Sequence, residues 1–538
     1  MKKAFRASRG VGRLCGCRVT APGVSSLALL VVGLCGCVPG SELPRWASRE
    51  FIPDSARQYV EFLASDELEG RNTPSPGLLR AAEYLAAAFQ RWGLQPIGDS
   101  YWHYYELVRR DVDRDSLQLR IQRGSAVWEA QIPEHAVPHP TTAAGCYSQA
   151  PLVLVGPGVP DSVVVAQAAQ KLRGSVVLFV RAVSGSRDTA EREHTASQPP
   201  LMAFGRLLHR YGVVGMLVVN YPEGQRKLRP QRYPWPALNP AFSRYGPPLQ
   251  LPTEDSEVPV IYSVGSEVLE ALFGAEEVFR QRVRAADSLG QALIEPLPGV
   301  SVDIAVAFRE VERVRVPNVV GMLRGRMRPQ EYVLIGAHYD HVGVMATPGS
   351  ADSIYNGADD NASGTAGLML VARALSRMQR SPERTIVFVA FSGEEKGLLG
   401  SRAFVRQPPL PLDGCLAMLN MDMIGRNHPD SLSVGVRGEW LLRLIEQENR
   451  RLPTPFLIGR EAEDLFGRSD HASFAARGIP VAFFHTGLHE DYHRPSDHAE
   501  KINPDKLSRV ALLVARVAWR IAQQGRGEQP PREHTERP

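Results

Sequence analysis

Five clusters of polar residues in the C-terminal half of the chain have side chains that can bind metals or move protons. They are, in chain order, HYDH (338–341), GADDNASG (357–364), SGEE (392–395), MD (421–422) and DYHRPSD (491–497). Four of them follow apolar runs that predict buried strands. In an open α/β sheet, ligands bind beyond the carboxyl ends of the strands. We therefore expect the clusters to meet at one edge of a sheet.

Imidazole and carboxylate groups suit zinc and similar divalent metals. Each cluster alone has an ordinary structural explanation: Glu394 and Glu395 would favour a helix start, and Asp359 and Asp360 could form a turn and an N-cap. Five clusters at one predicted edge favour a metal site instead. Five ligands can hold two metals if one carboxylate bridges them, and two metals about 3.5–4 Å apart can activate a shared water molecule. A further carboxylate must take the proton, so one of the two glutamates can coordinate while the other acts as base.

The elements that must position these residues alternate between apolar strands and amphipathic helices. The pattern predicts an α/β fold with a mostly parallel central sheet and helices on both faces. The predicted strands are 332–337, 385–391, 416–421 and 480–485, and the predicted helices lie near 77–92, 362–378, 439–451 and 504–523.

A different pattern occupies the middle of the chain. Short β-rich runs at 151–156, 175–180, 215–220 and 258–264 are separated by turn signals, which predicts an inserted β-rich domain over residues 141–290. Residues 224–259 are crowded with Pro and Arg, and they predict a long surface loop.

Composition and charge exclude some classes of function. The chain has 538 residues, of which 43% are hydrophobic and 22% are charged, as expected for two or three globular domains. Its net charge of +4 is small and scattered along the chain. We therefore expect no nucleic-acid partner.

The N-terminus predicts export. Residues 1–36 combine a basic start with a short apolar segment, which is typical of a signal peptide and falls short of the about 20 apolar residues that span a bilayer. The segment ends in LCGC, which resembles a bacterial lipobox, so Cys37 is a candidate lipid anchor on a protein facing the periplasm or the cell exterior. An ordinary signal peptide cleaved nearby is the alternative. Residues 37–53 would then be a tether.

The remaining cysteines are too few for a disulfide framework, and the C-terminus predicts a tail. Only Cys146 and Cys415 would accompany Cys37 after processing, so the fold does not depend on a disulfide framework, and the sequence does not decide whether this pair bonds. Residues 526–538 are polar and rich in Pro, which predicts a disordered tail.

The motifs GAHYDHVG, GADDNASG, SGEEKGLLGS, NMDMIGR and YHRPSD occur in an order that resembles the co-catalytic zinc aminopeptidase family, which also includes glutamate carboxypeptidases and glutaminyl cyclases. The resemblance implies a peptidase domain built from residues 54–140 and 300–525. The segment 141–290 is more loosely similar to the protease-associated domain that is often inserted in these enzymes.

The resemblance also implies two zinc ions per chain and a role for each motif residue. One zinc would be held by His338 and Asp422, the other by Glu395 and His493, and Asp359 would bridge them. Glu394 would be the general base, Asp340 would orient His338, and Tyr492 would stabilise the oxyanion. The peptide bond between Asp359 and Asp360 would be cis.

Some assignments stay open at this level. Spacing alone does not separate His493 from His489 as a ligand. SDHASF (469–474) matches a further family motif, in which Asp470 and His471 are either structural or substrate-positioning. Arg426, which follows the Asp422 strand, is expected to be solvated or ion-paired, and a contact with substrate is the alternative.

The expected reaction is hydrolysis of the N-terminal peptide bond of peptide substrates by water that zinc and Glu394 activate. A carboxypeptidase or dipeptidase is one alternative, and it would need cationic groups for the substrate carboxylate. A glutaminyl cyclase is another. A non-catalytic binding ectodomain is a third, against which the complete set of ligands and base argues.

Overall fold

The computed structural model describes residues 43 and 45–523, except for 184–200, 223–226, 234, 240–248, 253–256, 289–291 and 347–350. The predicted signal peptide, Cys37 and the predicted tail lie outside the described residues. Parts of the predicted loop 224–259 do so as well.

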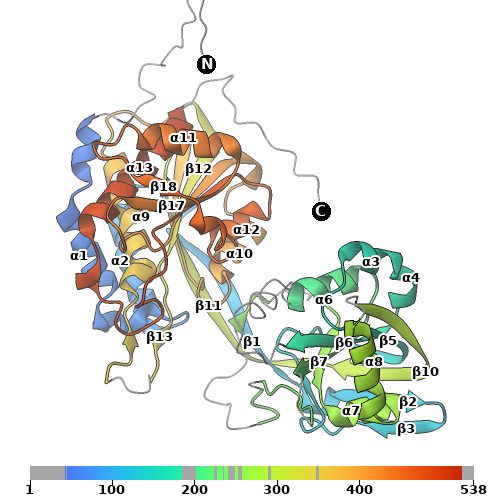
Figure 1. The fold of residues 1–538 in the computed structure, drawn as a ribbon. Helices are drawn as coiled ribbons and strands as arrows, with labels where there is room; N and C mark the ends of the chain where they lie inside the picture. Colours follow the sequence, from blue (N-terminus) through green and yellow to red (C-terminus); the bar gives the residue numbers. More distant parts are fainter. Residues whose placement is uncertain are drawn as a thin grey trace, which may run out of the picture. The chain divides into compact units, whose positions relative to one another are not determined.

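The largest sheet in the described part of the chain has nine strands (Figure 1). Their order across the sheet is β18-β17-β19-β16-β12-β15-β11-β1-β8. Its strands are β1 (Trp102–Val112), β8 (Leu249–Gln250), β11 (Phe308–Leu323), β12 (Arg328–His338), β15 (Arg384–Phe391), β16 (Cys415–Met421), β17 (Ser431–Arg437), β18 (Leu457–Gly459) and β19 (Val481–His485). The central strands β19, β16, β12 and β15 run parallel, whereas β17 and β11 flank them antiparallel. The predicted α/β class is confirmed, with the parallel pairing concentrated at the centre.

Alternate residues of the central strands face two helical layers. In β12, Val333 and Ile335 pack under one layer and Leu334 under the other. The first layer contains α1 (Pro53–Leu63), α2 (Pro76–Arg91), α9 (Gly364–Ser376), α11 (Glu439–Asn449) and α13 (Pro504–Gln523). The second contains α10 (Leu399–Arg406) and α12 (His471–Ala475). Burial on both faces explains why these strands are continuously apolar.

The long antiparallel pair β1 and β11 was not among the predicted strands. The first half of β11 is largely exposed, and charged residues cross the pair, as in the ion pair of Arg109 Nε with Glu312 Oε2 at 2.7 Å. Sequence patterns identify a strand by the apolar residues that it buries, so a strand without an apolar run is hard to predict.

An eight-stranded sheet with the order β3-β2-β10-β5-β6-β7-β9-β4 forms from residues 118–306. Its strands are β2 (Gln118–Arg123), β3 (Ala126–Glu129), β4 (Ala136–Pro138), β5 (Gly145–Gly156), β6 (Val176–Val183), β7 (Gly215–Pro222), β9 (Val260–Val264) and β10 (Leu293–Val306). One face packs on α7 (Ser266–Phe273) and α8 (Glu276–Ser288), and the other on α3 (Ser162–Gln167), α4 (Ala169–Leu172) and α6 (Leu201–Arg210). The sheet reaches beyond the predicted range 141–290, because β2 to β4 precede that range and β10 follows it.

Two predicted irregular segments are packed in part. Within the predicted tether, residues Arg45–Glu50 form a 3₁₀ helix in which Ala47 is buried. Within the predicted loop 224–259, Trp235 is 3% exposed and its Nε1 donates to Pro138 O at 2.7 Å. Cys146 is exposed, Cys415 is buried, and both are free thiols.

A small two-stranded sheet pairs β13 (Gly343–Val344) with β14 (Ile354–Tyr355) beside the loop that leads to residue 358. Among the helices in the described part of the chain, none combines the length and apolar character that crossing a membrane requires.

Candidate metal centre

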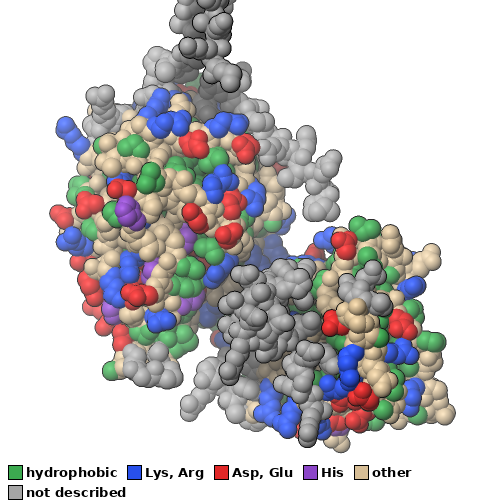
Figure 2. Space-filling model, viewed as in Figure 1, with side chains coloured by type: hydrophobic (Ala, Val, Ile, Leu, Met, Phe, Trp, Pro, Cys, Tyr) green, Lys and Arg blue, Asp and Glu red, His purple; other side chains and the backbone are tan. Residues whose placement is uncertain are grey.

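The predicted clusters meet at the carboxyl ends of the central parallel strands. His338 is the last residue of β12, and Asp422 directly follows β16. Glu394 and Glu395 begin three residues after β15, and His493 lies eight residues after the end of β19. Histidine side chains show on the visible face of this part of the molecule in Figure 2. These residues come from four of the five motifs, and the fifth, GADDNASG (357–364), supplies Asp359 and Asp360 to the same edge of the sheet.

The first group of metal-binding side chains consists of His338, Asp360 and Asp422. His338 Nε2 lies 3.4 Å from Asp360 Oδ1 and 3.4 Å from Asp422 Oδ1. All three residues are buried, and both His338 Nε2 and Asp422 Oδ1 lack a hydrogen-bond partner. Burial alone would lower the pKa of His338, but the charges of Asp422 and Glu394 raise it well above its usual value.

The second group consists of His341, Asp360, Glu395 and His493. His493 Nε2 lies 2.9 Å from Asp360 Oδ2 and 3.1 Å from Glu395 Oε2. Its side chain is 36% exposed, so this group opens toward solvent more than the first. Burial would lower the pKa of His493, but Asp360 and Glu395 raise it to about 10.

Asp360, and not Asp359, is the residue that the two groups share. Its Oδ1 faces His338 and its Oδ2 faces His493. The prediction that Asp359 bridges the groups is not supported, because its Oδ1 accepts from Gly425 N at 2.7 Å and its Oδ2 lies 3.3 Å from His489 Nε2. The carboxylate of Asp359 is therefore directed toward neighbouring loops instead of the two groups.

The cis peptide bond is displaced by the same single residue. It joins Asp360 to Asn361, so the prediction of a cis bond between Asp359 and Asp360 is wrong. Neighbouring aspartates have the same chemistry in a sequence pattern. Their orientations are set by contacts with distant loops, which the pattern does not contain.

The loop that carries Asp360 is tied to the segment that follows β16. Asn361 Nδ2 donates to Met421 O at 3.0 Å, and Asn361 Oδ1 accepts from Met423 N at 3.2 Å. A side chain on Gly364 would come within 2.4 Å of Met421 O, so glycine allows α9 to begin directly against this segment. These contacts explain why the loop that brings Asp360 next to Asp422 is rich in small and polar residues.

Glu394 lies beside the first group without belonging to either group. Its Oε2 is 3.9 Å from His338 Nε2, and its side chain is 9% exposed. Burial and the charges of Glu395 and Asp422 raise its pKa well above the usual value, although His338 opposes this. By contrast, hydrogen bonds from His341 and His493 lower the pKa of Glu395 against the opposing effect of burial. The two adjacent glutamates therefore have different environments.

Asp340 fixes the backbone near Glu394 and contacts His338 through its main chain. His338 Nδ1 lies 3.2 Å from Asp340 O, while the nearer carboxylate oxygen is 3.7 Å away. The carboxylate itself accepts from Glu394 N at 3.2 Å and from Thr73 Oγ1 at 3.0 Å. Asp340 thus holds both the imidazole and the glutamate segment, although its carboxylate is not the closest partner of His338.

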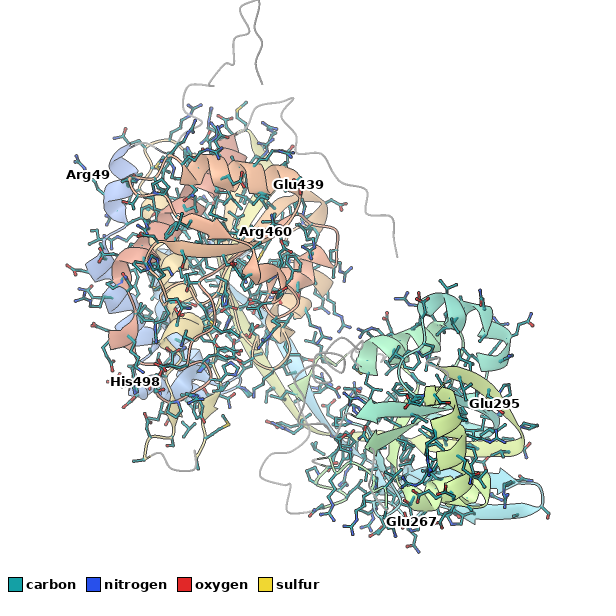
Figure 3. The ribbon with its side chains drawn as sticks, in the orientation of Figure 1. Arg49, Glu267, Glu295, Glu439, Arg460 and His498 are labelled. Carbon is teal, nitrogen blue, oxygen red and sulfur yellow. The ribbon has the colours of Figure 1, made fainter. Side chains whose placement is uncertain are left out.

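The histidines in the loop after β19 contact different partners. His489 is directed at Asp359 and does not join either group. His498, labelled in Figure 3, is 36% exposed and its Nε2 lies 3.8 Å from Asp352 Oδ2. Of these histidines, His493 is the one whose imidazole reaches the shared aspartate.

Tyr492 stacks on His493, with ring centroids 4.0 Å apart. Its hydroxyl oxygen accepts from Arg468 Nη2 at 3.1 Å, which leaves its own O–H free to donate. Burial raises the pKa of Tyr492, so the hydroxyl keeps its proton at neutral pH.

Residues near the site also include the pair from the SDHASF motif. Asp470 is fully buried, both of its carboxylate oxygens lack hydrogen-bond partners, and burial raises its pKa to about 7. His471 stacks on Phe483 at 4.3 Å, and burial lowers its pKa to about 3. Arg426 is ion-paired with Asp491 at 2.8 Å, as expected from the sequence.

The donor set fits divalent zinc. Two ligand atoms that share a tetrahedral zinc at about 2.0–2.1 Å lie about 3.4 Å apart. The distances of His338 Nε2 to Asp360 and Asp422 match this value. His341, which the sequence interpretation did not single out, has its Nδ1 2.8 Å from Glu395 Oε1, as in a direct hydrogen bond. That contact suits a residue that orients Glu395, as the outer partners of metal ligands do.

Residues 318–518 match the model of a family described as peptidase family M28, which confirms the motif resemblance over that segment. A probable leucine aminopeptidase of Trichophyton verrucosum is 28% identical over 216 residues, which cover 38% of this chain and 58% of the relative. The chain therefore spans less than two thirds of the first curated relatives that it matches.

Two further proteins are similar to this chain over segments of different length. A glutamate carboxypeptidase 2 homolog of Caenorhabditis elegans is 33% identical over 189 residues, which cover 33% of this chain and 22% of that protein. The solved aminopeptidase of Aneurinibacillus sp. strain AM-1 is 20% identical with a TM-score of 0.49, covering 90% of this chain and 97% of that one.

Substitution of the two neighbouring aspartates should lower zinc affinity strongly at one position and little at the other. Asp360→Asn removes a charged donor from both groups, so zinc affinity should fall by more than the roughly 10- to 100-fold that follows loss of an outer partner. Asp359→Asn keeps an oxygen for Gly425 N, so it should change zinc affinity by less than tenfold, which is below the usual cost of losing an outer partner. Zinc titration against a chelator of known affinity measures both. Equal losses in the two variants, or a larger loss in Asp359→Asn, would contradict the assignment of Asp360.

Proposed function

Starting from the match of residues 318–518 to peptidase family M28, we propose that this protein is a two-zinc peptidase that removes residues from the N-terminus of peptides. The proposal of two metal ions rests on one observation. The carboxylate of Asp360 presents Oδ1 to the group with His338 and Oδ2 to the group with His493. A carboxylate in this position supports a bridge between two cations.

The proposed ligands follow from the two groups. His338 and Asp422 would hold one zinc, Glu395 and His493 the other, and Asp360 would bridge them. His341 would hold Glu395 in place through its 2.8 Å contact. When bound, the two ions would polarise the scissile carbonyl and lower the pKa of a water molecule to about 7.

Glu394 is the proposed general base. Its carboxylate is buried beside the first group, and its N–H donates to Asp340, which restrains its position. A general base works best when its pKa lies near the working pH. Burial and nearby carboxylates raise the pKa of Glu394, and positive charge from bound metal would oppose that rise. Glu394 can then accept a proton from water and pass it to the leaving amine.

Tyr492 is proposed to donate a hydrogen bond to the oxyanion that forms at the scissile carbonyl. Its O–H is free to donate because Arg468 already supplies the hydrogen bond to the hydroxyl oxygen. A donor fixed before the reaction stabilises developing negative charge without reorganisation. Stacking on His493 restrains the ring of Tyr492 beside the second group.

The similarity to a probable leucine aminopeptidase supports cleavage at the N-terminus of peptides. Arg468 is an exposed cation beside Tyr492, which is the kind of group that a carboxypeptidase would use for a substrate carboxylate. The test must therefore compare both ends of the peptide. We also propose that the eight-stranded sheet and its helices form the inserted protease-associated-like domain.

A substrate panel on metal-replete, full-length protein tests the proposed specificity. Peptides with a free N-terminus should be cleaved whether or not the C-terminus is blocked, and peptides with a blocked N-terminus should resist. Cleavage that requires a free C-terminus would indicate a carboxypeptidase. Formation of pyroglutamate from N-terminal glutamine without peptide cleavage would indicate a glutaminyl cyclase, and no turnover would favour a binding protein.

Substitution of each of the two adjacent glutamates by glutamine distinguishes the general base from the zinc ligand. Glu394→Gln removes the proton acceptor but none of the proposed ligands, so both zinc ions should remain while kcat falls by roughly 10²- to 10⁴-fold. Glu395→Gln should weaken one of the two ions, and excess zinc should restore part of the rate. Metal analysis together with kinetics at several zinc concentrations measures both effects. Loss of metal in Glu394→Gln with full retention in Glu395→Gln would reverse the roles.

The proposed location is the outer side of a bacterial membrane, with a lipid on Cys37. Cys37→Ser removes the acylated thiol, so the protein should move from the membrane fraction to the soluble fraction and keep its specific activity. Fractionation and a peptidase assay measure this. Membrane association that is unchanged in Cys37→Ser would refute the anchor.

A further inference from the structure

Asp497 is a buried carboxylate to which the proposed function assigns no role. It lies four residues after His493, and its side chain is 1% exposed. Its Oδ2 accepts from the main-chain N–H groups of Asp359 at 2.9 Å and Asp360 at 3.2 Å. Its main-chain carbonyl accepts a third hydrogen bond from Ala358 N at 3.0 Å. One residue therefore holds three successive amides of the loop that presents Asp360.

The same residue is anchored in the loop that carries His493. Its N–H donates to Arg494 O at 3.2 Å, which closes a turn that starts one residue after His493. Its other oxygen, Oδ1, lies 3.7 Å from Arg426 Nη1. Arg426 follows Asp422 by four residues. Asp497 thus lies where the segments that carry three of the proposed ligands meet.

We propose that Asp497 is a positioning residue that orients the carboxylate of Asp360 and thereby sets the affinity of both metal ions. This inference rests on the proposed two-metal function. Hydrogen bonds to an ionised carboxylate are shorter and stronger than those between neutral groups. Two of them to successive amides restrict rotation of the peptide planes on either side of Asp359. Because Asp360 faces both groups, a small rotation of its backbone affects both ions together.

Asp111 provides a matched control for a purely structural effect. Its carboxylate is also buried and also accepts two main-chain hydrogen bonds, from Val112 N at 2.9 Å and from Ala237 N at 2.9 Å. None of these residues belongs to the proposed ligand groups. Asp111→Ala therefore removes equivalent hydrogen bonds without affecting the loop that presents Asp360.

The experiment titrates metal-free, full-length protein with zinc in competition with a chelator of known affinity. Asp497→Ala should raise the Kd of both zinc ions by about 10- to 100-fold, the usual cost of losing an outer partner. Asp497→Asn keeps an oxygen that can accept both N–H groups, so it should recover most of the affinity. Asp111→Ala should lower thermal stability and leave both Kd values unchanged. Circular dichroism of each variant checks that it is folded.

The outcomes separate this inference from the proposed function. If the wild-type protein does not bind two ions, the two-metal function fails, and this inference fails with it. If the wild type binds two ions and Asp497→Ala binds both with unchanged affinity, or loses only one, the positioning role is wrong. If Asp497→Ala does not fold, Asp497→Glu takes its place, because the longer side chain misplaces the oxygens and should weaken both ions. Retention of both affinities in that variant would also overturn the proposal.

Discussion

Charge compensation in a buried cluster is the constraint on which the rest of this site depends. The side chains of Asp360, Glu394, Glu395 and Asp422 are between 6% and 9% exposed. Burial of an ionised carboxylate costs several kcal/mol unless positive charge and hydrogen bonds compensate it. The facing histidines respond with raised pKa values, which marks the cluster as short of positive charge. Binding of two divalent cations would satisfy this requirement and release the histidine protons.

The surrounding loops hold this unfavourable cluster through hydrogen bonds from polar side chains to main-chain groups. Arg71, in the segment before α2, is fully buried and donates to Tyr339 O at 2.8 Å and to Gly357 O at 3.0 Å. It thereby joins the end of β12 to the loop that presents Asp360. Burial lowers the pKa of Arg71 and the charges of Asp340 and Asp360 oppose this, so the guanidinium also places positive charge close to the cluster. Rigid supports of this type keep a site preorganised for metal and substrate.

The sequence predicted the structure best where a buried apolar strand leads into a polar cluster. The runs that became β12, β15, β16 and β19 are apolar on both sides, so they predicted the centre of the sheet and hence the edge where the clusters meet. Strand β11 was not predicted, because its first half is exposed and charged.

The limits of sequence pattern are sharpest at individual side chains. Asp359 and Asp360 are equivalent in a pattern, and their directions are decided by Gly425, His489 and Asp497, which are distant in the chain. His341 was also missed, because its contact with Glu395 joins residues 54 positions apart. Both features depend on how loops pack together after the strands have formed.

Anomalous diffraction from crystals of the zinc-loaded, full-length protein, collected on both sides of the zinc absorption edge, would locate each zinc ion and the carboxylate that bridges them. A two-zinc centre bridged by Asp360 should give two zinc peaks about 3.5–4 Å apart, with one oxygen of Asp360 bound to each. The predicted first ion contacts His338 and Asp422, and the second contacts Glu395 and His493. A single zinc peak in fully loaded crystals would contradict the two-zinc centre, and two peaks bridged by Asp359 would contradict the role of Asp360.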